Sequence, residues 1–306
     1  MKPAVRRGCP LCGGADGPVE VRPDVDPTAL GEVELRRYWT GFHGRRVFFP
    51  YVRCAACGML HNRDYLDAED TATLYAAMED NMAEAGSENT AATQHGYVDL
   101  VARAAPPTAD YVEIGPDTGV FAADCISRGM VDRTLWMCEP NRAVWGRLSA
   151  LRRDGLDVEL APDLTLLDRI PPGTVGVAVA VHVLDHVVDP MAVLRGIRRA
   201  MAPGGVVFVV VHDERSVLRR VLGRGWPPFR LQHPQLFSPA TLTRCLSSSG
   251  FGDVTIRRTW NRFDCRFLVD TLFTVTLGRR GVAPRVLEKL RCSLPLGNIA
   301  GIGVAS

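Results

Sequence analysis

Apolar strand-like segments alternate with helical segments from residue 109 to residue 212, and this alternation constrains the fold more than any other feature of the chain. The strand-like runs are ADYVEIG, TLWMCEP, LDVELA, TVGVAVAVHVL and GGVVFVVVH, and helical runs such as NRAVWGRLSALRRDG and PMAVLRGIRRAM separate them. Strands that are apolar on both faces and connected by helices predict a parallel sheet that is covered on both sides. We therefore expect a doubly wound α/β domain.

The overall composition narrows the class of protein. The chain has 306 residues, of which 46% are hydrophobic and 23% charged, so it can bury a substantial core. Its longest apolar runs are far shorter than the roughly 20 residues that a membrane span needs. The 36 basic residues are interspersed with 34 acidic ones and form no stripe. We expect a cytoplasmic protein that contacts no membrane and is not built to bind nucleic acid.

Four of the nine cysteines form two pairs with identical spacing. They are Cys9 and Cys12 in CPLCGG and Cys54 and Cys57 in CAACGM, and a glycine follows each pair. Two Cys-x-x-Cys turns supply the four thiolates of a tetrahedral structural zinc site. Neither pair begins a helix within a β-α-β unit, as a thioredoxin-like redox pair would. The odd total argues against a disulfide framework, so we expect structural zinc in a reducing compartment.

The chain divides into three parts at changes of pattern. Residues 1–62 carry the paired cysteines among glycines, prolines and short strand-like pieces, which predicts a small zinc-ribbon module. Residues 63–105 predict a helical linker, with one helix over 64–86, that ends at a Pro-Pro pair. Residues 106–306 contain the α/β domain, and its tail includes a helical stretch over 262–278 that continues into APRVLEKLRCSL.

The first strand of the α/β domain runs into a glycine-containing turn, YVEIGPDTGVF. Gly115 and Gly119 allow the backbone to turn sharply and to approach a ligand, and a helix that begins near Gly119 directs its positive end at that ligand. Glu139 follows the next strand, where a carboxylate can accept hydrogen bonds from both hydroxyls of a ribose. The combination predicts a ligand of the adenosine type.

Asp117 is unusual in this turn, because a dinucleotide-binding loop carries glycine at the corresponding position. Its carboxylate would repel a pyrophosphate at close range. S-adenosylmethionine has no phosphate, and its ammonium group could donate a hydrogen bond to an acidic side chain. The alternative is a solvated turn residue that contacts no ligand.

Four segments occur in the order of a known family. They are VEIGPDTG, CEPN, VHVLDHVVDPMAVLRGIRRAMAPGG and HPQLFSPATLTRCLSSSGF, and they resemble the cofactor loop, ribose acid, fourth-strand exit and later segments of class I S-adenosylmethionine-dependent methyltransferases. The resemblance covers residues 96–306, and the cysteine pairs extend it to members with an N-terminal zinc ribbon, such as sugar C-methyltransferases and other small-molecule methyltransferases. It implies a Rossmann-like seven-stranded sheet with an antiparallel last strand, for which NIAGIGVAS is the candidate.

The resemblance also implies which residues bind S-adenosylmethionine. Together with the acid in the loop, these cofactor-binding residues are Glu113, Gly115, Asp117, Gly119, Glu139, Asp163 and Leu164. The residues of the loop would line the methionine and ribose side, and Glu139 would hold the ribose. Asp163 and Leu164 would approach the adenine.

Histidines at strand ends and in a proline-rich loop are the candidates for contact with the methyl acceptor. Positioning supplies most of the acceleration in methyl transfer, and a base is needed only where the acceptor loses a proton. Histidine titrates near neutral pH and suits that task, so we assign it to His182, His186 and His233, with His212 as a further candidate. Packing or helix capping is the alternative for each. Asp185 stands where the family more often has glutamate.

These features predict methyl transfer from S-adenosylmethionine to a small-molecule acceptor such as a sugar, a polyketide or a peptide-derived intermediate. Oxygen, nitrogen and carbon acceptors stay open, and so does a protein partner. One alternative is a non-methylating descendant of the fold that serves another reaction or a partner protein. Another is an RNA methyltransferase whose zinc module grips nucleic acid, although acidic residues within 1–62 argue against it.

Overall fold

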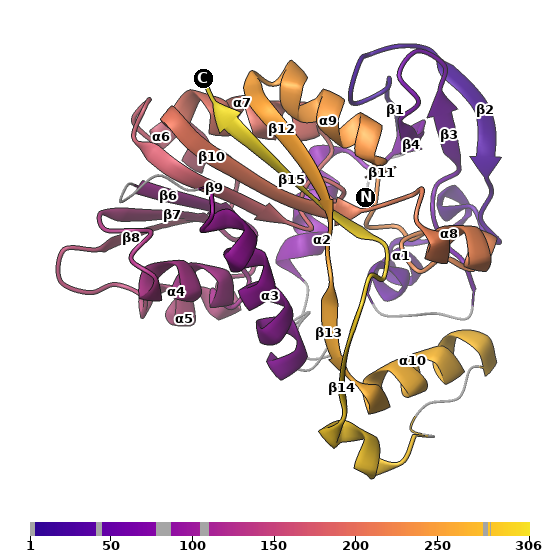
Figure 1. The fold of residues 1–306 in the computed structure, drawn as a ribbon. Helices are drawn as coiled ribbons and strands as arrows, with labels where there is room; N and C mark the ends of the chain where they lie inside the picture. Colours follow the sequence, from indigo (N-terminus) through magenta and orange to yellow (C-terminus); the bar gives the residue numbers. More distant parts are fainter. Residues whose placement is uncertain (1–3, 41–44, 78–86, 105–109, 278–280, 282) are drawn as a thin grey trace.

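A seven-stranded sheet forms the centre of the computed structural model, which describes residues 4–40, 45–77, 87–104, 110–277, 281 and 283–306 (Figure 1). In sheet order its strands are β12 (Phe251–Arg258), β15 (Asn298–Ala305), β10 (Met201–His212), β9 (Val175–Val181), β6 (Asp110–Ile114), β7 (Thr134–Cys138) and β8 (Asp157–Ala161). The five strands of the predicted alternation are parallel to one another. This confirms the expected sheet.

The final strand is antiparallel to both of its neighbours, as the sequence predicts for NIAGIGVAS. β15 pairs with β10 on one side and with β12 on the other. Its inner position requires close packing against α9 (Pro239–Ser248). A Cβ atom at Gly301 would lie 2.8 Å from Leu246 Cδ1 and 3.1 Å from both Leu242 Cδ2 and Val209 Cγ2, so the strand needs glycine there.

Helices cover both faces of the sheet (Figure 1). One face packs against α6 (Leu166–Arg169), α7 (Pro190–Ala200) and α9, and the other against α3 (Ser87–Val101), α4 (Val120–Ser127) and α5 (Trp145–Ser149). Successive side chains of a strand point to opposite faces, so Val112 belongs to the first apolar core and Tyr111 to the second. This arrangement confirms the doubly wound fold. None of the helices in the described ranges is long and apolar enough to cross a membrane.

The N-terminal module is built on a second sheet that also takes a strand from the α/β domain. In the order β11-β4-β3-β2 this sheet contains β2 (Asp16–Val21), β3 (Tyr51–Cys54), β4 (Leu60–Asn62) and β11 (Gln235–Leu236). β11 pairs antiparallel with β4. The remaining elements of this part are β1 (Val5–Arg6), which pairs with β5 (Asp64–Tyr65), and α1 (Glu32–Trp39).

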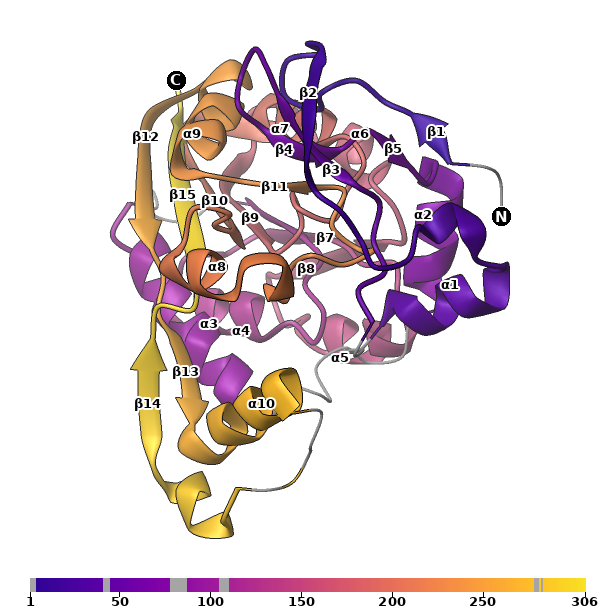
Figure 2. The same cartoon turned by 90° about the vertical axis from the view of Figure 1, so that its right-hand side faces the viewer.

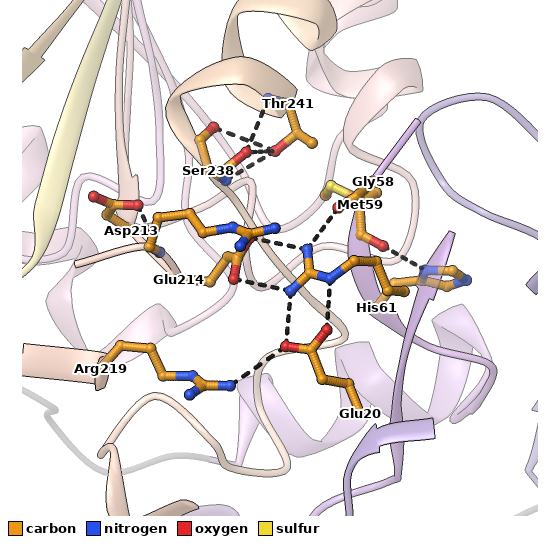
Figure 3. Close-up of polar contacts among 11 residues, drawn as sticks. Glu20, Gly58, Met59, His61, Asp213, Glu214, Arg219, Ser238 and Thr241 are labelled. Carbon is orange, nitrogen blue, oxygen red and sulfur yellow. Dashed lines mark hydrogen bonds and ion pairs between the residues drawn. The ribbon is translucent and has the colours of Figure 1, made fainter. Parts of the chain in front are cut away.

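Arg53 of β3 ties the two sheets together through two carboxylates (Figure 3). Its guanidinium group donates hydrogen bonds of 2.5 and 2.8 Å to Glu20 and of 3.0 and 3.1 Å to Glu214, which follows β10. Glu214 is buried, and a bidentate arginine is the partner that compensates a buried carboxylate best. The module is therefore held by side-chain ion pairs as well as by strand pairing.

Two predicted helices begin differently in the structure. The stretch 64–86 starts with β5, and α2 (Ala68–Ala76) begins only after Asp67, whose side chain accepts a hydrogen bond from the Asp70 amide; residues 78–86 lie outside the described residues. The stretch 262–278 starts with β13 (Asn261–Asp264) before α10 (Cys265–Leu277). Local pattern did not reveal these strands because their partners are distant in sequence.

The segment APRVLEKLRCSL was also predicted to be helical, and this was wrong. It forms a short 3-10 turn over Arg285–Lys289 followed by β14 (Arg291–Leu294), which pairs antiparallel with β13. Figures 1 and 2 show β13, β14 and α10 projecting together from one end of the molecule. One further helix, α8 (Val217–Leu222), follows β10.

The packing of β15 leads to a test of the fold. Gly301→Ala forces a methyl group against Leu242 and Leu246, and we expect it to lower the free energy of unfolding by about 1–3 kcal/mol. Gly146→Ala in α5 is the control, since nothing lies within 4 Å of its added methyl group, and we expect no loss there. Urea denaturation measures both. Equal stability of the two variants would contradict the packing described here.

Candidate functional site

The turn after β6 owes its shape to three residues in the left-handed region. The φ angles are 67° at Gly115, 49° at Asp117 and 77° at Gly119, and Gly119 is the N-cap of α4. Residues other than glycine rarely adopt positive φ, although aspartate tolerates it better than most. Asp117 therefore occupies a position where the backbone conformation favours glycine. Only the charge of Asp117, and not this backbone constraint, was considered from the sequence.

Both glycines of the turn are in close contact with neighbouring elements. A Cβ atom at Gly119 would lie 2.8 Å from Leu148 Cδ2 of α5, and one at Gly115 would lie 3.0 Å from Val183 Cγ2. Val183 follows β9 directly. The turn after β6 and the segment after β9 therefore lie against each other at the carboxyl edge of the sheet.

Glu139 holds the turn from the end of β7. Its Oε2 atom accepts a hydrogen bond from the Asp117 amide at 3.0 Å, and its Oε1 atom accepts one from the Asn141 amide at 2.8 Å. Burial raises the pKa of this carboxyl although both amides lower it. Each carboxylate oxygen has a second lone pair, so the group can still accept hydrogen bonds from ribose hydroxyls.

The other predicted cofactor residues lie along the same edge but differ in exposure. Asp163 and Leu164 are exposed in the segment after β8, where Asp163 Oδ1 accepts a hydrogen bond from the Thr165 amide at 2.9 Å. Glu113 is buried within β6, and the Tyr111 hydroxyl donates to its Oε2 atom at 2.7 Å. Burial, together with the nearby carboxylates of Glu139 and Asp117, raises the Glu113 pKa to about 8, although the hydrogen bond from Tyr111 opposes the shift. Glu113 is therefore largely protonated at neutral pH.

The structure brings all four candidate histidines together around Asp185. His182 directly follows β9 and His212 ends β10, and their ring centroids lie 4.6 Å apart. His182 Nδ1 lies 3.9 Å and His212 Nε2 3.8 Å from Asp185 Oδ2. We call His182, Asp185 and His212 the open triad, because the two histidine side chains keep 29% and 21% of their surface exposed while Asp185 is fully buried.

His186 and His233 form a second histidine pair next to Asp185, in which His186 is partly exposed and His233 is buried. Their Nε2 atoms lie 3.0 Å apart. His186 Nδ1 is 2.7 Å from the Tyr75 hydroxyl of α2, and His233 Nδ1 is 2.6 Å from the Pro228 carbonyl oxygen. The sequence of the loop that carries His233 fits either an acceptor wall or a packed surface loop, and in the structure its Trp226 and Phe229 are buried against the N-terminal module.

Burial changes the titration that the sequence predicted for these histidines. We expected imidazoles that titrate near neutral pH, but burial lowers the pKa of His186 to about 4 and that of His212 to about 3. It also holds the pKa of His233 well below its ordinary value. Charging an imidazole away from water is unfavourable, so these groups are neutral under physiological conditions.

The four paired cysteines converge in the N-terminal module. Cys9 Sγ lies 3.4 Å from Cys57 Sγ and Cys12 Sγ lies 3.5 Å from Cys54 Sγ, and all four sulfurs lie within 4.8 Å of one another. Disulfide bonds are much shorter, about 2.05 Å, whereas sulfurs around a tetrahedral zinc ion with bonds of about 2.3 Å stand nearly 3.8 Å apart. The separations fit a metal site.

The two turns that present these cysteines have the same backbone geometry. The Gly13 amide donates to the Cys9 carbonyl at 2.8 Å, and the Gly58 amide donates to the Cys54 carbonyl at 2.9 Å. Both glycines have positive φ, 66° and 76°. The glycine after each pair therefore serves the tight turn that the sequence predicts.

Two neighbours of the histidines were not found from the sequence. Asn298 begins β15 and lies 2.9 Å from His212 through its Oδ1 atom, and Tyr75 contacts His186 from α2. No spacing in the sequence links these residues to a strand end. Only the inner position of β15 and the packing of α2 place them here.

A family model described as a methyltransferase domain matches residues 90–256. A curated ubiquinone biosynthesis O-methyltransferase of Idiomarina loihiensis is 27% identical over an alignment of 154 positions that covers 47% of this chain and 62% of that protein. The chain therefore spans less than two thirds of the length of this relative.

Solved structures share the fold at low sequence identity. A methyltransferase of Haloferax volcanii in complex with the Trm112 activator is 16% identical with a TM-score of 0.52, over 75% of this chain and 99% of that one. An S-adenosylmethionine-dependent methyltransferase of Thermotoga maritima is 17% identical with a TM-score of 0.46, over 72% and 90%. The first of these supports the same fold.

The cysteine cluster predicts one tightly held zinc ion. Cys54→Ser removes one of four thiolates, and we expect the zinc that survives dialysis against a chelator to fall from one ion per chain to none. Cys292→Ser is the control, because Cys292 lies outside the cluster. Elemental analysis measures both. Retention of zinc by Cys54→Ser would contradict the assignment.

The raised pKa of Glu113 predicts a pH-dependent stability. Between pH about 4.5 and about 8 the carboxyl ionises in the unfolded chain but stays protonated in the folded one, so stability falls as pH rises, by about 1.4 kcal/mol for each unit. Glu113→Gln lacks this effect. We expect the melting temperature of the wild type relative to Glu113→Gln to fall as pH increases through this window. A difference that is constant with pH would contradict the assignment.

Proposed function

This chain belongs to the family of S-adenosylmethionine-dependent methyltransferase domains, and from that premise we propose that it transfers the methyl group of S-adenosylmethionine to a small-molecule acceptor. The observation that carries the proposal is the hydrogen bond from the Asp117 amide to Glu139. This hydrogen bond places a turn with positive φ angles next to a carboxylate of the kind that binds ribose. Both lie at the carboxyl edge of a doubly wound sheet, where such folds bind their ligands.

The charges along this edge suit the proposed cofactor better than a dinucleotide. Asp117 and Glu139 place two carboxyl groups near the turn, which would repel a pyrophosphate but attract an ammonium and a sulfonium group. The N-terminus of α4 offers free amides to the cofactor carboxylate. In this proposal the turn holds the methionine part, Glu139 the ribose, and Asp163 with Leu164 the adenine.

The reaction itself is an in-line displacement at the methyl carbon. The acceptor atom forms a bond to this carbon while the carbon–sulfur bond breaks, and the bonding electrons stay on the sulfur. Holding the acceptor about 3–3.5 Å from the methyl carbon supplies most of the acceleration. Of the three histidines predicted to be catalytic, His182 and His186 are partly exposed and His233 is buried. The His182 side chain lies just beyond the end of β9 with 29% of its surface exposed.

A small molecule is favoured over RNA as the acceptor. Two arginines near the end of β10 are paired with carboxylates, since Arg53 binds Glu20 and Glu214, and Arg219 lies 3.4 Å from Glu20, both of which are labelled in Figure 3. An RNA-binding surface needs cations that remain free for phosphates. A sugar, polyketide or peptide-derived acceptor fits a site that buried imidazoles line. The complex of the Haloferax methyltransferase with an activator supports a protein partner as an additional proposal.

Calorimetric titration with S-adenosylmethionine tests the cofactor part of the proposal. Glu139→Gln removes a charged acceptor of ribose hydroxyls, and we expect the dissociation constant to rise about tenfold or more. Asp117→Arg places a cation next to the sulfonium, and we expect binding to be lost. Asp157→Asn, at the opposite end of its strand and exposed, is the control and should bind like the wild type.

Two outcomes would overturn the proposal. One is a wild-type protein that shows no heat of binding with S-adenosylmethionine or S-adenosylhomocysteine up to millimolar concentration. The other is an affinity that stays the same in both Glu139→Gln and Asp117→Arg. Mass spectrometry of natively purified protein adds an independent measurement, because co-purified S-adenosylhomocysteine identifies the cofactor without any acceptor.

A further inference from the structure

We propose that the open triad of His182, Asp185 and His212 binds a divalent first-row transition metal ion, separate from the site formed by the four cysteines. One ligand atom from each of the three side chains lies within 4.8 Å of the others. Both imidazole nitrogens approach the same carboxylate oxygen, at 3.9 and 3.8 Å. Metal–nitrogen and metal–oxygen bonds of about 2.0–2.2 Å span such separations.

The hydrogen bonds around His212 leave a lone pair that faces the carboxylate. The Asn298 amide group donates from Nδ2 to Asn261 Oδ1 at 3.3 Å, so its Oδ1 atom accepts from His212 Nδ1 at 2.9 Å. His212 Nδ1 then carries the ring proton and Nε2 carries a lone pair. Two electron-rich atoms, His212 Nε2 and Asp185 Oδ2, therefore face each other unless a cation lies between them.

This arrangement is typical of a histidine that binds a metal. Ligating imidazoles donate their second ring N–H to a carbonyl or carboxylate oxygen, which fixes both the tautomer and the ring. The Asn298 carbonyl oxygen does this for His212. His182 keeps its tautomer free, because the contact from Asn298 Nδ2 to His182 Nε2 is 3.4 Å, long for a hydrogen bond.

Two buried atoms of the triad lack a hydrogen-bond partner in the part of the chain that the structure describes. They are Asp185 Oδ1 and His182 Nδ1. Asp185 is fully buried, and its other oxygen accepts one hydrogen bond of 3.1 Å from the His212 amide. Leaving a buried polar atom unpaired is unfavourable, and an ion bound by the triad would give His182 Nδ1 a partner.

The second histidine pair, His186 and His233, is by contrast explained without an ion. His233 donates from Nδ1 to the Pro228 carbonyl, so its Nε2 atom can accept a proton from His186 Nε2 across 3.0 Å. The Tyr75 hydroxyl then donates to His186 Nδ1. Every polar atom of this pair has a partner, and we therefore assign the ion to the open triad.

The donor set indicates the class of ion. Two imidazole nitrogens and one carboxylate oxygen suit zinc, iron, cobalt, nickel or manganese, and three protein ligands leave coordination positions open. The partly exposed side of the triad is the side from which an acceptor could reach the ion. If the proposed function holds, an acceptor oxygen bound there would lose its proton more readily, and His182 would hold the ion instead of acting as the base.

Cobalt titration tests the triad. The cysteine site is first filled with zinc, and Co²⁺ is then added to the wild type, Asp185→Asn, His212→Ala and the control His95→Ala. We expect one equivalent of Co²⁺ to bind the wild type and His95→Ala, with visible d–d bands but no thiolate-to-cobalt charge-transfer band. We expect both triad variants to bind at least about 100-fold more weakly.

Asp185→Asn is the sharpest of these variants. An asparagine oxygen can still accept the His212 amide, so the variant removes the charge with little change of shape. His95 is an exposed histidine paired with Asp124 on the opposite face of the sheet, and it controls for histidines that bind cobalt nonspecifically. Cobalt binding that is absent in the wild type, or unchanged in both triad variants, would overturn the proposal.

A measurement on the wild type alone guards against variants that fail to fold. Pulsed electron paramagnetic resonance of the copper-loaded protein should show coupling between the copper ion and imidazole nitrogens. Absence of this coupling would overturn the proposed site. Calorimetry with S-adenosylmethionine separates the two proposals. Protein that binds the cofactor but no cobalt contradicts the metal site only, and protein that binds cobalt but no cofactor contradicts the proposed function only.

Discussion

The parallel hydrogen bonding of β6 with β9 and of β9 with β10 brings the carboxyl ends of three strands to one edge, and both parts of the site depend on it. The glycine turn proposed to bind the cofactor follows β6, and the histidines of the open triad lie directly after β9 and at the end of β10. The two parts touch where Val183 packs against Gly115. Because parallel strands all point the same way, residues far apart in sequence meet here without any local contact.

The N-terminal module covers this edge from the side. β11 joins the module sheet immediately after His233, and the Tyr51 hydroxyl of β3 donates to the His233 carbonyl at 2.6 Å. The module in turn is held in shape by the cysteine cluster, which connects its first turn to the end of β3. Zinc in that cluster would thus help to fix the position of the histidines through the strands of the module, although the zinc site itself would take no part in methyl transfer.

Much of the fold could be predicted from the sequence. The predictions were correct where the local pattern of apolar, glycine and cysteine residues was strong. Five apolar runs separated by helices specify a parallel sheet because no other arrangement buries both faces of every strand. The cysteine turns were equally clear, since Gly13 and Gly58 mark the same backbone geometry twice. The pairing of β13 with β14 was missed, because these strands are short, half-exposed and separated in sequence by α10.

The sequence by itself determined the layered sheet, the glycine turn with Glu139 and the four cysteines, all of which follow from patterns within a few residues or from strand order. Tertiary structure alone decided what the histidines do. Asp185, His212 and Asn298 come from three segments, and they meet because β15 inserts antiparallel beside β10. It also set their charge, since burial favours neutral imidazoles over charged ones, and burial is a property of the folded chain that no single stretch of sequence encodes.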